Sequence, residues 1–174
     1  MPCTSPSRFF TLALALAFAV LAQSCKFGYS FTGASISPEV KTVSIQTFQN
    51  FAPLVQPALS QALTEKLKDK FLSQTSLKPV KNDGDLAFEG QITNYVTQPI
   101  AVQSNETASQ NRLTITINVK FTNRFDPKQD FETNFSRFAD YDSRLALQSV
   151  ENDLMRQINE QLVTDIFNKS VSNW

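Results

Sequence analysis

The side chains that most often carry out catalysis or hold metal ions are scarce in this sequence. It contains no histidine and only two cysteines, which excludes Ser/His/Asp and Cys/His nucleophilic sites and the usual zinc ligand sets. Two carboxylate pairs remain for acid and base chemistry, Asp83 with Asp85 and Asp140 with Asp142. Both pairs lie among turn-forming residues, where aspartate caps and bends the backbone. We therefore expect a protein that is not an enzyme and that uses neither a metal nor a cofactor.

Cys25 is the one side chain whose neighbours indicate a specific reaction. It ends the sequence LAQSC, which approximates the site where bacterial lipoproteins are cleaved and acylated. Upstream, Arg8 supplies a positive charge, and Phe9–Leu21 forms an apolar run of about 13 residues, too short to span a bilayer. The sequence thus predicts a lipoprotein signal peptide at residues 1–24 and a single domain at residues 25–174 with a lipidated N-terminus.

Ordinary signal cleavage is the alternative, because Ala22-Gln23-Ser24 also fits a small-x-small cleavage site. That cleavage leaves Cys25 as an unpaired thiol in an oxidising compartment, and acylation removes this problem. The residue after Cys25 is Lys26. An aspartate at this position typically retains bacterial lipoproteins at the inner membrane, and this chain lacks it. We therefore expect a protein that is lipid-anchored to the outer membrane on its periplasmic side.

Charge gives little sign of a nucleic-acid partner, because the net charge at pH 7 is zero and loss of Arg8 leaves one excess negative charge. Basic residues still gather in one region. Arg112, Lys120 and Arg124 share parity along one expected strand, and Arg137 lies in the next. They are candidates for a small cationic patch that meets phosphate or carboxylate groups, the alternative being ordinary solubilising charges. Three uncharged residues of the same face are candidates for polar contacts: Thr114, Thr116 and Asn118.

Hydrophobic periodicity predicts the elements that position these residues. Apolar residues that alternate with polar ones indicate strands, and leucines four residues apart indicate helices. The polar stretch 99–111 indicates a mobile loop. Two one-faced helices and an alternating strand pair predict an α+β, two-layer sandwich, with both helices on one face of a mostly antiparallel four- to five-stranded sheet. The expected strands are 27–36, 40–48, 86–96, 112–124 and 131–138, and the expected helices are 56–73 and a C-terminal one capped by Asp142 or Ser143 and ending near Ser170.

Three segments, together with the expected lipidated Cys25, carry a family resemblance: GYSFTGASI at 28–36, LSQALTEKLKDKF at 59–71 and FSRFADYDS at 135–143. With this element order, the chain resembles the LptE family, and more narrowly the LptE-like outer-membrane lipoproteins of Bacteroidetes. The resemblance implies a non-enzymatic protein with two helices on a mostly four-stranded sheet. It also implies a role as a plug inside the LptD β-barrel, in a 1:1 complex that inserts lipopolysaccharide into the outer leaflet.

A plug needs polar walls, because the lumen of a large barrel is polar. We therefore expect the threonine-rich strand and the 99–111 loop to contact the barrel. The resemblance further implies binding of lipopolysaccharide through basic residues, for which Arg112, Lys120, Arg124 and Arg137 are the candidates. Two alternatives stay open. One is a free periplasmic lipoprotein that binds a small envelope ligand between helices and sheet, and the other is a hydrolase that uses a carboxylate pair.

Overall fold

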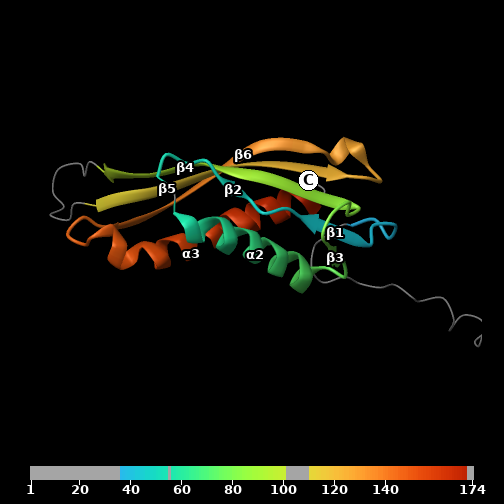
Figure 1. Cartoon of the computed structure of the whole chain (residues 1–174), viewed down its shortest axis with the longest axis horizontal. Helices are drawn as coiled ribbons and strands as arrows, with labels where there is room; N and C mark the ends of the chain where they lie inside the picture. The colour runs from blue at the N-terminus through green and yellow to red at the C-terminus, as the bar shows by residue number, and fades with distance from the viewer. Residues whose placement is uncertain (1–35, 55, 101–109, 172–174) are drawn as a thin grey trace, which may run out of the picture. The chain divides into compact units, whose positions relative to one another are not determined.

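The structure is a computed structural model that describes residues 36–54, 56–100 and 110–171. Two helices lie on the same face of one sheet (Figure 1), so the predicted α+β sandwich is confirmed. The elements are β1 (Thr42–Ile45), β2 (Gln49–Asn50), α2 (Pro57–Gln74), β3 (Lys78–Val80), β4 (Leu86–Ile100), β5 (Gln110–Asn123), the short 3-10 helix η1 (Pro127–Gln129), β6 (Phe131–Asp142) and α3 (Leu147–Val171).

The sheet has the strand order β3-β1-β4-β5-β6, and β2 pairs with β4 on the side of β1. The long strands β4, β5 and β6 form an antiparallel meander, whereas the short strands β1, β2 and β3 pair in parallel. The described sheet therefore has six strands, slightly more than predicted. The additional strands are two or three residues long, too short to show alternation in the sequence. Pro79 marks β3 as a turn in the sequence, but proline is tolerated at the sheet edge where β3 lies.

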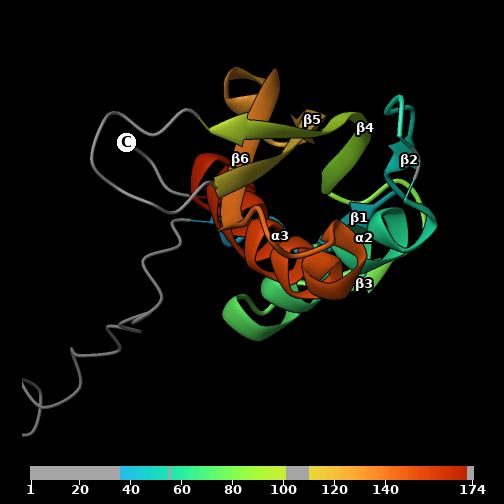
Figure 2. The same cartoon turned by 90° about the vertical axis from the view of Figure 1, so that its left-hand side faces the viewer.

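The core lies between the sheet and the helices (Figure 2). The alternation predicted along β5 is confirmed, because every second side chain from Leu113 to Phe121 is fully buried. The leucine stripe of α2 and the apolar face of α3 cover that surface. Phe71 of α2 joins the two layers, since its ring centroid lies 4.9 Å from that of Phe88 on β4 and 5.0 Å from that of Phe167 on α3.

The predicted start of the C-terminal helix is wrong. Asp142 does not cap the last helix, because it is the last residue of β6 and pairs with Gln110 of β5. The Asp142 carboxylate instead accepts a hydrogen bond of 2.9 Å from the backbone N–H of Arg144, and the helix begins at Leu147. The reason is that β5 and β6 pair further than the hydrophobic alternation of the sequence extends.

The predicted loop 99–111 is shorter than expected, because Pro99 and Ile100 of β4 pair with Asn111 and Gln110 of β5. Residues 101–109 lie outside the described residues, as do the predicted signal peptide, Cys25 and residues 27–35 of the first predicted strand. Ile36 is described and packs, half-buried, against the core. None of the described helices has the length and apolar content needed to cross a membrane.

Candidate interaction surface

The face of the sheet turned away from the helices, here called the outer face, carries an uncharged polar band across β4, β5 and β6. The register places Thr116 beside Ser136, and their hydroxyl groups lie 2.9 Å apart and share a hydrogen bond. The Asn118 amide donates a 3.1 Å hydrogen bond to the side-chain oxygen of Asn134. We call this group the polar band, and it consists of Gln91, Asn94, Thr114, Thr116, Asn118, Asn134 and Ser136.

Arg112 lies near one end of the polar band and is held by its neighbours. Its guanidinium donates hydrogen bonds of 2.7 and 2.9 Å to the two carboxylate oxygens of Asp140 and lies 3.6 Å from the ring centroid of Phe138. The hydrogen bonding raises the pKa of Arg112 and lowers the pKa of Asp140. Both charges are therefore balanced within the pair, and Phe138 stays half-exposed beneath the guanidinium.

Lys120 and Arg124 lie toward the other end of the outer face. The register sets Lys120 between Glu89 of β4 and Glu132 of β6, and its Nζ lies 4.0 Å from a Glu89 oxygen. Arg124 follows β5 and donates its backbone N–H to the Asp85 carbonyl at 2.9 Å. Within the described residues its guanidinium has no carboxylate at ion-pair distance, but its charge contributes to lowering the pKa of Asp85, which lines the same hollow.

Arg137 does not join the other three. It pairs in register with the buried Ile115 and therefore lies on the helix side of the sheet. There its guanidinium donates hydrogen bonds of 2.5 and 2.8 Å to Asp165 of α3. The prediction that the four cations form one patch is thus wrong in geometry. The sequence contains the signal that separates them, because Arg137 shares parity with Phe131 and Phe135, which pack against the core.

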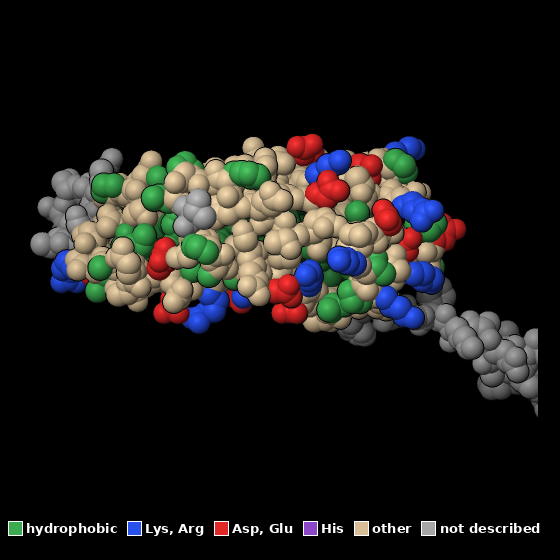
Figure 3. Space-filling view, in the orientation of Figure 1, with side chains coloured by type: hydrophobic (Ala, Val, Ile, Leu, Met, Phe, Trp, Pro, Cys, Tyr) green, Lys and Arg blue, Asp and Glu red, His purple; other side chains and the backbone are tan. Residues whose placement is uncertain are grey.

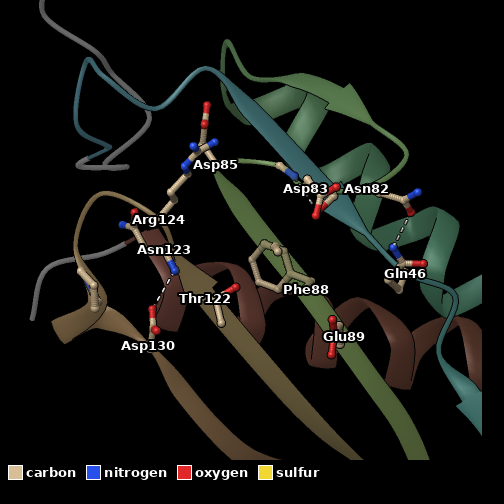
Figure 4. Close-up of a pocket in the computed structure, with 14 residues that line it drawn as sticks. Gln46, Asn82, Asp83, Asp85, Phe88, Glu89, Thr122, Asn123, Arg124 and Asp130 are labelled. Atoms are coloured by element: carbon tan, nitrogen blue, oxygen red, sulfur yellow. Dashed lines mark hydrogen bonds between the residues drawn. The ribbon is translucent and has the colours of Figure 1, made fainter.

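A hollow of about 890 Å³ lies at the Arg124 end of the outer face (Figure 4). Asp85 stands beside it and accepts hydrogen bonds of 2.9 and 3.0 Å from the backbone N–H groups of Lys41 and Thr42. These bonds, first the one from Lys41, lower the pKa of Asp85. Asp83 adopts a positive φ of 53° in the preceding turn. This carboxylate pair is thus used to shape the connection into β4.

The second predicted pair is separated by its strand. Asp140 binds Arg112, whereas Asp142 binds Arg144, whose side chain and backbone hydrogen bonds lower the pKa of Asp142 to about 2. Within residues 36–54, 56–100 and 110–171, no group of three or more acidic, histidine or cysteine side chains is arranged to hold a metal ion.

A second hollow, of about 580 Å³, crosses the outer face between β2 and β6. Gly90 and Asn118 line it together with Phe51, whose side chain is 64% exposed. The prediction from the sequence did not include Phe51. The available signal was the absence of any charged residue from 42 to 64. Figure 3 shows the consequence, because charged side chains gather toward the end with β1 and β3 while much of the remaining visible surface is uncharged.

A six-stranded sheet with two helices on one face is an α+β scaffold whose other face lies open. The sequence model of the LptE family, described as lipopolysaccharide assembly, matches residues 40–170. The chain therefore belongs to the LptE family, a family of non-enzymatic lipoproteins of lipopolysaccharide assembly, which confirms the resemblance found in the sequence. No curated protein matches the sequence.

Solved structures share the fold at low sequence identity. A neuraminyllactose-binding hemagglutinin homolog from Helicobacter pylori is 12% identical with a TM-score of 0.50, covering 82% of this chain and 89% of that one. A protein from Xanthomonas campestris is 10% identical with a TM-score of 0.50, covering 79% and 90%. A minor lipoprotein from Acinetobacter baumannii is 17% identical with a TM-score of 0.49, covering 75% and 92%. These similarities concern the fold alone.

Proposed function

We propose that this protein is an outer-membrane lipoprotein, attached through acylated Cys25 on the periplasmic side, that plugs and supports an LptD-type barrel. In a 1:1 complex the two proteins insert lipopolysaccharide into the outer leaflet. The family match over residues 40–170 supports a role in lipopolysaccharide assembly. The polar band is the observation that carries the finer proposal.

The polar band suits the wall of a barrel lumen, which is polar and wet. Its amides and hydroxyls bond to each other in the free chain, as in the pairs Thr116–Ser136 and Asn118–Asn134. The same groups can exchange these bonds for partners on a facing wall at little cost, because no buried charge has to lose its water. A surface of this kind tolerates close contact with a polar wall in more than one orientation.

The competing reading, a free lipoprotein with a small ligand between helices and sheet, finds less support. It needs an apolar cavity between the two layers. Side chains from both layers fill that space. Leu63 of α2, Phe88 of β4 and Ile117 of β5 are all fully buried in one core. The two outer-face hollows, by contrast, have polar linings and open on the side away from the helices.

The test is to tag the C-terminus of the full chain, extract the native outer membrane in mild detergent and identify stoichiometric companions by mass spectrometry. We expect one large LptD-type barrel in an equimolar amount. Recovery of the chain alone would contradict the plug and return the small-ligand lipoprotein to consideration.

Within this proposal, Lys120 and Arg124 are the cations positioned to meet sugar phosphates in transit, since Arg112 and Arg137 are held by Asp140 and Asp165. The double charge reversal Lys120→Glu/Arg124→Glu should weaken lipopolysaccharide binding more than tenfold, because each of the two residues can lose a hydrogen bond to a charged group that contributes about 1.5–3 kcal/mol. Surface plasmon resonance with immobilised lipopolysaccharide measures this change.

The matched control reverses the same number of charges on the helix layer, Lys68→Glu with Arg156→Glu, where both side chains are solvent-accessible. It should bind as the unaltered chain does. Equal weakening by both variants would mean that binding follows net charge, and no weakening by either would remove Lys120 and Arg124 from the proposal.

A further inference from the structure

The two most exposed of the large apolar side chains in the described part of the chain are neighbours in one turn. Phe51 is 64% exposed and Leu54 is 59% exposed, between β2 and α2. Removing such a side chain from water is favourable. A stable fold that leaves two of them in water at one place therefore presents a small apolar contact surface.

Hydrogen bonds hold this turn in a fixed conformation. The backbone N–H of Phe51 donates to the carbonyl of Ile92 on β4 at 2.9 Å. The Asn50 side chain joins both ends of the turn, since its oxygen accepts from the Ala52 N–H at 3.0 Å and its amide donates to the Gln56 carbonyl at 3.2 Å. Ala52 is buried at the base. A surface fixed in this way loses little conformational entropy when a partner binds it.

The turn projects from the molecule beside the outer face. In Figure 2 the segment between β2 and α2 extends beyond the sheet and away from both helices. Phe51 forms one wall of the 580 Å³ hollow, and Gln91 and Asn118 of the polar band form part of its lining. The apolar turn and the polar band are therefore continuous, so a partner that lies on one meets the other.

The surroundings of the turn indicate the chemistry of that partner. No charged residue occurs from 42 to 64, and none occurs from 91 to 100 on the neighbouring strand β4. The hollow beside Phe51 is also lined by Glu89, Lys120 and Glu132, where the lysine lies between the two carboxylates. Segments that dock on an anionic bilayer carry lysine or arginine beside their apolar residues, and this turn has neither. The complementary surface is an uncharged protein wall that provides an apolar recess for two side chains.

We infer that the turn at residues 51–54, through Phe51 and Leu54, is the apolar anchor by which this chain seats on an uncharged wall of its barrel partner. The inference rests on the proposed function and assigns to it a contact outside the polar band. Seating both side chains in a recess fixes the rotation of the plug, which the polar band alone leaves free because its hydrogen bonds are exchangeable.

The experiment places the photo-crosslinking residue p-benzoylphenylalanine in place of Phe51 or Leu54 in the full chain, in its native envelope. Matched controls carry it in place of Leu72 or Leu145, which are also large, apolar and exposed, at 45% and 48%. After irradiation, we expect adducts of Phe51 and Leu54 variants with the barrel, identified by mass spectrometry of the crosslinked peptides, and at least tenfold less adduct in the controls.

The outcomes separate the two proposals. If the barrel co-purifies with the chain but positions 51 and 54 give no more adduct than the controls, the anchor is wrong and the plug stands. If the barrel does not co-purify, both are wrong. An adduct with a second copy of the chain, or with lipid, would also overturn the anchor.

A second variant tests the energetic contribution. Phe51→Ser/Leu54→Ser should reduce the barrel retained by the tagged chain about tenfold, while Leu72→Ser/Leu145→Ser leaves it unchanged. Because all four side chains are exposed, both double variants should unfold within a few degrees of the unaltered chain. Retention that is equal in the two double variants would contradict the anchor.

Discussion

Asp85 shows how a single carboxylate organises the end of the sheet. Besides accepting from the N–H groups of Lys41 and Thr42, it donates its own N–H to the Thr42 hydroxyl at 2.9 Å and accepts the Arg124 N–H at its carbonyl. It thereby joins the start of β1, the start of β4 and the residue after β5. Gly84 precedes it because an added Cβ would lie 2.4 Å from the backbone nitrogen of Ser44.

We expect Asp85→Ala to lower the midpoint of thermal unfolding and to change its pH dependence. The pKa of Asp85 lies below its ordinary value of 3.8 in the folded chain, so the charged form stabilises the fold. That contribution is complete above the unfolded-state pKa and is lost as the pH falls through the lowered folded-state pKa. The difference in midpoint between the two proteins should be constant above about pH 5 and shrink below about pH 4.

Calorimetry across that pH range measures the difference, and Asp85→Asn is the control. Asparagine keeps an oxygen that accepts the N–H groups of Lys41 and Thr42 but carries no charge. It should lower the midpoint less than alanine does, and the remaining difference from the unaltered protein should again vanish at low pH. A difference that grew on acidification would contradict the assignment.

The sequence predicts best which side chains of a strand face the core and which face away from the helices. Every second side chain of β5 is buried as expected, and the polar parity from Thr114 to Lys120 faces away from the helices. Alternation along one strand does not predict which residue of the next strand lies opposite, because the register between two strands depends on the geometry of the turn that joins them. The acidic neighbours of Arg112 and Lys120, namely Asp140 and Glu89, lie on neighbouring strands, so no spacing along the chain indicates them.

At the scale of elements, helix-to-sheet packing outweighs the ion pairs between them. Phe71 is fully buried and contacts aromatic rings of β4 and α3. The pair Arg137–Asp165 also joins the sheet to α3, but its side chains are 46% and 27% exposed. A partly exposed pair of this kind contributes little, because water screens it and ordering two side chains costs entropy.

We therefore expect Phe71→Ala to lower the free energy of unfolding by about 3–5 kcal/mol, the usual cost of a cavity left by a buried phenylalanine. In a double-mutant cycle with Arg137→Ala and Asp165→Ala, the coupling energy should be about 1 kcal/mol or less. Urea unfolding followed by circular dichroism measures both. A coupling energy above that of the Phe71 substitution would reverse this ranking.

The long elements follow from the sequence and the short ones do not. The helix predicted at 56–73 appears as α2, Pro57–Gln74, because its leucines recur every four residues and Pro57 suits a first helical position. β1 lies within the strand predicted at 40–48, but β2 and β3, of two and three residues, arise instead from parallel pairing with β4 and β1. Those contacts are tertiary, so local periodicity carries no trace of them.

At the scale of the whole molecule, the sheet edges formed by β3 and β6 resist further strand addition. β3 is three residues long and contains Pro79, while β6 carries Glu132 and Asp140 on its outer side and Arg137 on its inner side. Short edges, prolines and charges, including inward-facing ones, prevent edge-to-edge pairing. Beyond Ile92, β4 pairs only with β5 among the described residues and stays open on its other side. The broadest surface left for a partner is the outer face, whose centre is uncharged.

If the outer face lies against a polar barrel wall as proposed, charge placed at its centre should disrupt the complex without unfolding the chain. Thr116→Asp/Asn134→Asp adds two carboxylates to the polar band. Closing the interface then removes water from unpaired charges, which is costly, so retention of the barrel by the tagged chain should fall at least tenfold. Aspartate at 134 still accepts from the Asn118 amide, so the chain loses at most the Thr116–Ser136 hydrogen bond. That bond is worth about 0.5–1.5 kcal/mol, and the chain should remain folded.

The control adds the same charge to the helix layer through Asn152→Asp/Gln157→Glu, at two exposed positions of α3. If the outer face is the contact, this control retains the barrel as the unaltered chain does. If instead the control releases the barrel and the polar-band variant keeps it, the helices face the wall. The outer face of the sheet would then be open to the lumen, and the plug would be turned the opposite way from the proposed orientation.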